Sequence, residues 1–323
     1  MIVKPYVRPD VEGVLAMLAA QEGPLMHEVD AATARQMMLA MKELTETPRG
    51  ELADVKDLEI DGPDGNRIPL RIYRPADSKD AAPVLVFYHG GGWVIGDLAT
   101  HDSACAEIAR LLGMTVVSVD YRLAPEHKFP AAPNDCEAAT RWVAGSPAEI
   151  GHPVTGLVLS GDSAGGNLAA ITSQALAGKL PVPIMAQWLI YPAVDMTDRT
   201  GSMEEFAEGY LLTRDSMDWF EAAFIPDGTS REHPRLSPLK GNNLADQPPT
   251  LVFTCGLDPL RDQGRNYASA LIQAGVPTVY REAAGQIHGS LTLRQAIPSA
   301  QDDLKGCIAA LGTMIAEQQG AAA

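Results

Sequence analysis

The feature that most constrains the fold is a regular alternation of short apolar runs with longer helical segments from about residue 54 onward. There are six such runs, and most are dense in Val, Ile and Leu, which is typical of strands buried on both faces of a sheet. They are PVLVFYH, TVVSVDYR, GLVLSG, IMAQWLIYP, TLVFTCG and TVYREA. The segments between them are rich in Ala and Leu, which favour helices. The alternation predicts an α/β fold with a mostly parallel sheet covered by helices.

A hairpin precedes this alternation. The runs VKDLEI and RIPLRIYRP flank the turn-rich segment DGPDGN. Two short strands joined in this way are typical of an antiparallel hairpin. We expect it at one edge of the sheet, which then has eight strands.

Two segments, residues 1–50 and 196–226, do not follow the alternation, and neither has enough apolar residues for a complete core of its own. Ligands of open α/β sheets bind at the carboxyl ends of the strands. We therefore expect these two segments to pack together over that edge as a helical cap. Residues 51–195 and 227–323 would form the catalytic domain.

Capping residues predict where the cap helices begin. Asp30 precedes the second helix of the N-terminal segment, and Met37, Met41 and Leu44 share one face of that helix. Thr213 is the expected N-cap before DSMDWFEAAF in the other segment.

Charge and composition exclude several functions. With 41 acidic against 25 basic residues the chain carries a formal charge of −16, which disfavours nucleic acid and anionic lipid as partners. No apolar run is long enough to insert stably in a membrane, and the start MIVKPYVRPD lacks a secretory signal, so a cytoplasmic location is expected. No CxxC or HExxH pattern occurs, so neither a metal nor another cofactor is expected. The four cysteines are expected to be free thiols.

The strongest catalytic signal is the pentapeptide from Gly161 to Gly165, which lies between an apolar run and a helical segment. A G-x-S-x-G motif in that context is typical of a nucleophile elbow, with Ser163 on a tight turn. Glycines leave room where the backbones approach. The alternative is an ordinary Gly-Ser turn.

A second signal is His89-Gly-Gly-Gly-Trp, directly after the apolar run PVLVFY. Consecutive glycines leave backbone N–H groups uncovered, as an oxyanion hole requires. We expect Gly91 and Gly92 to supply two donors and Ala164, just after the serine, a third. A flexible loop is one alternative; a phosphate cradle is another, but the P-loop Lys-Ser/Thr is absent.

A serine nucleophile needs a base, and His288 is the best candidate. It follows the last expected strand, with Gly289 leaving room beside it, and fits the serine, acid, histidine order of this motif set. His89 heads the glycine loop and is expected to hold that loop by hydrogen bonds. The other histidines are expected at the surface: His27, His101, His127, His152 and His233.

The acid should lie between Ser163 and His288, after the penultimate strand. Asp258 comes first after TLVFTCG and precedes a proline. Asp262 fits the first turn of the next helix, where a carboxylate is favourable. We favour Asp258, with Asp262 as the alternative and Asp195 as a more remote one.

Six motifs together resemble those of the bacterial hormone-sensitive-lipase-like esterases, family IV, of the α/β-hydrolase fold. They are HGGGWVIGD, DYRLAPEHKFP, GDSAGGNLA, LIYP, DPLRD and IHG, in that order. The resemblance spans residue 50 to the C-terminus. It implies Ser163, Asp258 and His288 as triad, the N–H groups of Gly91, Gly92 and Ala164 as oxyanion hole, and a helical cap. It also implies a possible homodimer through the sheet edge.

The chain departs from the family pattern near His288. Ser290 stands where an aromatic residue is usual, and Ala284 and Gln286 replace the more common proline and methionine. The charged segment DYRLAPE, by contrast, is similar to a buried structural network of the family. We expect its charged residues to be paired.

Candidate substrate-binding residues are apolar side chains of the cap and the glycine loop. Such residues often belong to the core instead. We select Met41, Trp93, Tyr210 and Trp219.

These features predict a serine carboxylesterase acting on a small-molecule ester with a short-to-medium acyl chain. One alternative keeps the triad but cleaves an amide, carbamate or acyl-amino bond. Another is a small-molecule receptor, since a plant relative binds gibberellin beneath its lid without catalysis. That relative has lost the histidine, which is present here.

Overall fold

The computed structural model describes residues 5–20, 22–76 and 80–321 of the chain. Its centre is an eight-stranded sheet with the order β1-β2-β4-β3-β5-β6-β7-β8. β2 runs antiparallel to β1 and to β4, and the pairs from β4 to β8 are parallel. The expected edge hairpin and the expected mostly parallel sheet are both confirmed.

The strands are β1 (Asp54–Asp61), β2 (Arg67–Arg74), β3 (Ala82–Tyr88), β4 (Val116–Val119), β5 (Val154–Asp162), β6 (Ile184–Ile190), β7 (Thr250–Leu257) and β8 (Thr278–Ile287). Strands β3 to β6 are buried almost throughout, as their dense Val, Ile and Leu content predicts.

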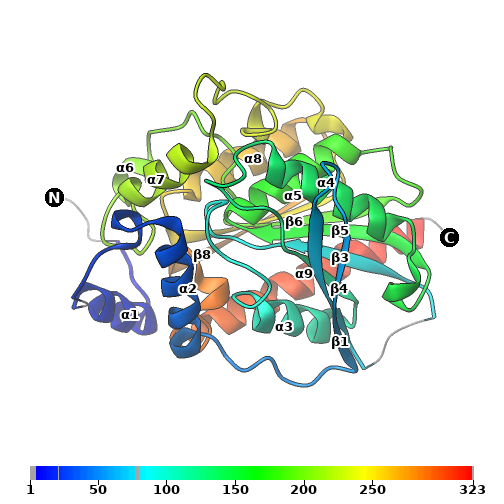
Figure 1. Ribbon diagram of the computed structural model, residues 1–323, viewed down its shortest axis with the longest axis horizontal. Helices are drawn as coiled ribbons and strands as arrows, with labels where there is room; N and C mark the ends of the chain where they lie inside the picture. Colours follow the sequence, from blue (N-terminus) through cyan, green and yellow to red (C-terminus); the bar gives the residue numbers. More distant parts are fainter. Residues whose placement is uncertain (1–4, 21, 77–79, 322–323) are drawn as a thin grey trace.

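Helices cover both faces of the sheet (Figure 1). One face carries α3 (Asp102–Leu112) and α9 (Ser299–Ala321), which pack against each other. The other carries α4 (Ala131–Ala144), α5 (Ala164–Leu176) and α8 (Arg261–Gln273). Because helices occupy both faces, two large apolar clusters form, one on each side of the sheet.

The remaining helices come from the two segments outside the alternation. The N-terminal one contains α1 (Pro9–Ala19), the short helix η1 (Met26–Glu28) and α2 (Ala31–Thr45). The segment after β6 contains α6 (Ser202–Glu205) and α7 (Arg214–Phe224). η1 contacts α7, so the two segments meet. Short helices η2 (Ala148–Ile150), η3 (Pro238–Lys240), η4 (Leu244–Asp246) and η5 (Ser290–Thr292) lie in connections.

Both predicted N-caps are confirmed. Asp30 accepts a hydrogen bond from the Thr33 N–H, and Thr213 accepts one from the Ser216 N–H. The apolar face of α2 is not buried along its whole length, because Leu44 is 71% exposed. The face turned inward carries Ala34, which is fully buried. No helix in the described ranges is long and apolar enough to cross a membrane.

Candidate active site

Ser163 lies at the sharp turn between β5 and α5. Its backbone has φ 55° and ψ −117°, a conformation that costs a non-glycine residue free energy. Its N–H donates to the Ile190 carbonyl at 2.8 Å, and its own carbonyl accepts from Asn167 at 3.0 Å. These bonds hold the strained turn, so the side chain projects beyond the carboxyl edge of the sheet.

Close backbone approach explains the glycines around this serine. A Cβ atom on Gly161 would overlap the carbonyl oxygens of Tyr88 and Gly165. A Cβ on Gly165 would overlap the same Tyr88 oxygen. The end of β3 thus packs directly on the elbow, and any side chain at either position would push the serine turn away from the sheet.

Three side chains from three loops form one hydrogen-bonded chain. Nε2 of His288 lies 2.8 Å from the Ser163 hydroxyl, and Nδ1 lies 2.7 Å from the Asp258 carboxylate. Asp258 is fully buried, and its other oxygen accepts from the Leu260 N–H at 2.8 Å. A carboxylate accepts only, so Nδ1 carries the imidazole proton and Nε2 is free to accept one from the serine.

The alternative acids are engaged elsewhere. Asp262 lies in the first turn of α8, where it accepts from the Ser202 N–H at 3.0 Å and pairs with Arg261. Asp195 pairs with Lys240 at 3.0 Å. Neither forms a hydrogen bond or ion pair with the imidazole.

The glycine loop after β3 presents uncovered N–H groups. Gly91, Gly92 and Trp93 have φ of 115°, 59° and 61°, so the loop turns sharply over three residues. Its conformation is fixed by the N–H groups of Val94 and Ile95, which both donate to the Gly91 carbonyl. Within the described residues the N–H groups of Gly91 and Gly92 have no acceptor.

Ala164 supplies the third candidate donor. It is the first residue of α5, and the first N–H groups of a helix lack intrahelical acceptors. The positive end of the helix favours negative charge at this point. Ala164 and Gly92 both line the same cavity as Ser163.

Two histidines lie beneath the glycine loop, and one of them corrects a prediction. His101 is fully buried rather than at the surface, with Nε2 3.2 Å from Asp162. His89 is also fully buried, with Nδ1 2.8 Å from the Gly90 carbonyl, as expected for a residue that holds the loop. Burial first, and then the charge of His101, lower the pKa of His89 to about 4.

The charged DYRLAPE segment forms a structural network. The Tyr121 hydroxyl donates to the His89 carbonyl at 2.7 Å. Arg122 pairs with the buried Asp135 at 2.8 Å, and Glu126 pairs with Arg35 of α2. The segment therefore supports the glycine loop from behind and ties it to the N-terminal helices.

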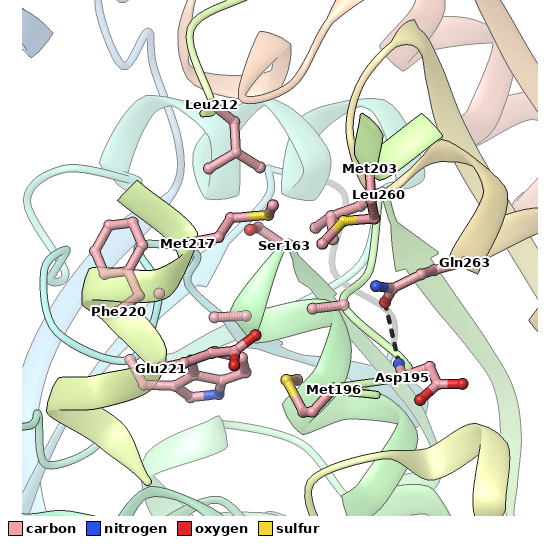
Figure 2. A pocket seen from close by; sticks show the side chains of 14 residues that line it. Ser163, Asp195, Met196, Met203, Leu212, Met217, Phe220, Glu221, Leu260 and Gln263 are labelled. Atoms are coloured by element: carbon pink, nitrogen blue, oxygen red, sulfur yellow. Dashed lines mark hydrogen bonds between the residues drawn. The ribbon is translucent and has the colours of Figure 1, made fainter. Parts of the chain in front are cut away.

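A cavity opens above the serine (Figure 2). Figure 2 shows Met217, Met203 and Leu260 around Ser163, with Glu221 and Asp195 at the other end. The lining is mostly apolar, and it is drawn largely from the segment after β6. The full set is Gly92, Trp93, Ser163, Ala164, Ala193, Asp195, Met196, Met203, Leu212, Met217, Phe220, Glu221, Leu260 and Gln263.

Of the four substrate-binding candidates, Trp93 belongs to this lining. Met41, Tyr210 and Trp219 are outside it. The Tyr210 ring packs edge-on against Phe206, and the Trp219 ring packs edge-on against Phe220, so both serve the packing of the cap helices.

Sequence reasoning missed the side chains that form the wall. Met203, Met217 and Phe220 lie on α6 and α7, and apolar spacing alone does not tell which face of a short helix meets a cavity. In the structure the Phe220 ring lies so close to Gly92 that a Cβ atom there would overlap it, a contact that the sequence does not signal. In the described part of the chain no cluster of His, Cys, Asp and Glu could hold a metal.

Comparison with known proteins agrees with this geometry. A family model described as alpha/beta hydrolase fold matches residues 85–292. Carboxylic ester hydrolase LipN of Mycobacterium tuberculosis is 43% identical over 82% of this chain and 72% of its own. Ethyl acetate hydrolase of Pseudomonas putida is 34% identical over 94% of this chain and 98% of its own.

Solved structures are equally similar. Ester-hydrolase EH1AB1 from the metagenome of Lake Arreo, in complex with a bipyridine phosphonate derivative, superposes with a TM-score of 0.91 at 38% identity, covering 95% of this chain and 99% of that one. A hyperthermophilic esterase from Pyrobaculum calidifontis gives 0.88 at 36% identity, covering 96% and 99%. The chain therefore belongs to the bacterial hormone-sensitive-lipase-like esterases, family IV, of the α/β-hydrolase fold, and is a carboxylic ester hydrolase.

Proposed function

We propose that the protein hydrolyses small esters with short-to-medium acyl chains by a two-step serine mechanism that needs no cofactor. The observation that carries this proposal is the hydrogen-bonded chain from Ser163 through His288 to Asp258. Ser163 lines a cavity together with Gly92 and Ala164, and the N–H groups of Gly91 and Gly92 have no acceptor among the described residues.

In the first step Ser163 Oγ attacks the ester carbonyl while His288 Nε2 accepts its proton. Asp258 stabilises the resulting imidazolium through Nδ1. Negative charge on the carbonyl oxygen is taken up by the N–H groups of Gly91, Gly92 and Ala164, each contributing about 3 kcal/mol. The alcohol leaves with the proton from the imidazolium.

In the second step water attacks the acyl-enzyme. His288 takes a proton from the water and returns it to Ser163 as the acid is released. Every proton passes through Nε2, so the tautomer fixed by Asp258 serves both halves of the reaction.

We further propose that residues 1–50 and 196–226 act as the cap that limits the acyl chain. The residues of 196–226 supply much of the cavity wall, including Met203 and Met217. None of the described residues of 1–50 lines the cavity; η1 packs on α7 behind it. Methionine side chains adapt to ligands of different shape, which supports breadth within a limited volume.

Ser163→Ala should lower turnover of p-nitrophenyl butyrate by about 10³-fold or more. Ser160→Ala is the matched control, because Ser160 is buried in β5, the strand that leads to Ser163, and its hydroxyl forms no hydrogen bond in the described structure. The control should retain activity. Undiminished turnover of Ser163→Ala would contradict the proposed nucleophile.

Substrate class is tested with one acyl group presented as ester and as anilide, and with p-nitrophenyl esters from acetate to laurate. We expect ester cleavage to exceed anilide cleavage, and butyrate or hexanoate to exceed laurate. Labelling of the Ser163 peptide by an organophosphonate separates a hydrolase from a silent receptor.

Two further properties are proposed. A homodimer through the sheet edge, which the family resemblance implies, would double the mass measured by light scattering. A cytoplasmic location would be shown by fractionation of the source cells.

A further inference from the structure

We propose that Asp162 and His101 form a buried ion pair that positions the glycine loop for catalysis. Neither side chain touches the substrate cavity in its described lining, so both are positioning residues. The inference depends on the proposed function, because it concerns the donors of the oxyanion hole.

One carboxylate oxygen of Asp162 contacts both Gly90 and His101. Oδ1 of Asp162 accepts from the Gly90 N–H at 2.8 Å and lies 3.2 Å from Nε2 of His101. Asp162 directly precedes Ser163, and Gly90 directly precedes Gly91. The carboxylate therefore connects the nucleophile elbow to the residue from which the oxyanion loop begins.

The fit at Gly90 is tight. A Cβ atom there would overlap Oδ2 of Asp162. Asp162 is 4% exposed and His101 is fully buried, so water does not compete for the N–H group or the carboxylate. Such a bond restrains the loop more than an exposed one would.

His101 is itself fixed by the segment that follows the loop. Its Nδ1 lies 3.0 Å from the Thr100 hydroxyl. Thr100 and Asp97 exchange two hydrogen bonds, from the Asp97 N–H at 2.9 Å and from the Thr100 N–H at 2.7 Å. The imidazole thus has a fixed direction toward Asp162.

The surroundings of Asp162 and His101 shift the pKa of both groups. Burial raises the pKa of Asp162, but the charge of His101 at 3.2 Å and the hydrogen bond from the Gly90 N–H lower it below its usual value. Burial lowers the pKa of His101, and Asp162 with Glu46 and Asp97 raises it above its usual value. His89 also faces His101 and is neutral, as its lowered pKa requires.

The two pKa shifts run in opposite directions, and each favours the charged form of its own group. A lone carboxylate beside the nucleophile would repel the oxyanion that forms there, since buried like charges interact strongly. The imidazolium cancels that repulsion while leaving the hydrogen bond to Gly90 intact.

The test compares Asp162→Ala, Asp162→Asn, His101→Gln and the double variant Asp162→Asn/His101→Gln. Asp162→Ala removes the acceptor for Gly90, and we expect kcat to fall about 100-fold with KM changed less than about three-fold. Asp162→Asn keeps an acceptor and should lose about ten-fold or less. Affinity for a trifluoromethyl ketone, which forms a tetrahedral adduct, should fall in parallel with kcat.

His101→Gln leaves Asp162 without its cation and should lower kcat about ten-fold. In the double variant position 162 no longer carries a negative charge, so kcat should recover toward that of Asp162→Asn alone. A role only in stability would not produce this recovery.

Asp303→Asn is the matched control. It removes the carboxylate of a part-buried ion pair with Arg8, outside the glycine loop and its supporting network, and should lower stability while kcat is retained. If Asp162→Asn and His101→Gln keep wild-type kcat and inhibitor affinity, the positioning role is overturned, even where Asp162→Ala does not fold. Absence of ester turnover in the wild type would overturn the proposed function as well.

Discussion

Single residues around Ser163, the proposed nucleophile, are selected by backbone geometry as much as by chemistry. The strained φ of Ser163 is held by hydrogen bonds of its own N–H and carbonyl groups. Gly161 and Gly165 are required because β3 passes so close to the elbow. The glycine spacing of the pentapeptide therefore permits the backbone conformation that presents the Ser163 hydroxyl.

Asp120 leads to a prediction about pH. It lies at the end of β4, with a carboxylate oxygen 3.8 Å from Nε2 of His89. Burial, and secondarily the charge of Asp97, raise its pKa from 3.8 to about 7, against a smaller opposing effect of Arg71. Between these values the folded state binds more protons than the unfolded state, so stability is lost as the pH rises.

We expect Asp120→Asn to remove that loss. The variant should gain roughly 1 to 3 kcal/mol over the wild type near pH 8 and almost nothing near pH 4, after allowance for the partial exposure of the carboxylate. Urea unfolding at the two pH values measures the difference. A gain equal at both would show that ionisation of Asp120 is not the cause.

At the scale of elements, α7 is the helix whose position most directly shapes the cavity. Its N-terminus is closed by a capping box in which Thr213 and Ser216 satisfy each other's backbone N–H groups. One face carries Met217 and Phe220 into the cavity wall. The stability of α7 is thus coupled to the shape of the proposed acyl site.

Thr213→Ala should cost about 1 kcal/mol of stability, since it removes an N-cap side chain. Because the first turn of α7 then loosens, KM for butyrate esters should rise more than kcat falls. The matched control is Thr313→Ala in α9, an exposed threonine whose hydroxyl only donates to the Ala309 carbonyl. If Thr213→Ala and Thr313→Ala change KM equally, the N-cap of α7 does not control the shape of the proposed acyl site.

α2 shows what helical periodicity leaves open. Met37, Met41 and Leu44 form an apolar stripe, yet Leu44 is largely exposed and Ala34 is buried. Arg35 decides the orientation by donating to the Val94 carbonyl at 2.8 Å and pairing with Glu126. Hydrophobic spacing predicted the helix but not which side meets the domain.

For the whole molecule, buried ion pairs tie the N-terminal segment to the C-terminal part of the chain. Glu46 and Arg294 lie 2.6 Å apart, and the side chain of each is 1% exposed. Arg8 pairs with Asp303 at 2.7 Å near the other end of the segment. These two ion pairs join residues near the N-terminus to residues near the C-terminus of the chain.

Glu46→Gln should destabilise the protein by about 3 to 5 kcal/mol, because it leaves the buried Arg294 charge without a carboxylate to neutralise it. Replacing both, as Glu46→Leu with Arg294→Met, should cost less than the single change. Thermal unfolding of the two variants measures this. Asp302→Asn, which breaks an exposed pair with Lys305, is the control and should have no effect; an equally small effect of Glu46→Gln would refute the role of the buried pair.

The sequence by itself determined the fold class, the edge hairpin and the position of the elbow. These depend on local properties: apolar density, turn residues, caps and a glycine spacing that permits one backbone shape. The order of motifs also placed Ser163, Asp258 and His288 after strand ends, and parallel strands bring such ends to one edge.

Only the tertiary structure decided which buried groups meet there. His101 stands in a polar stretch and was expected at the surface, yet it is buried against Asp162, 61 positions away. Met203 and Met217 entered the cavity wall in place of Met41, Tyr210 and Trp219. The reason is physical: burial and partner choice depend on contacts between distant segments, which local pattern and propensity do not encode.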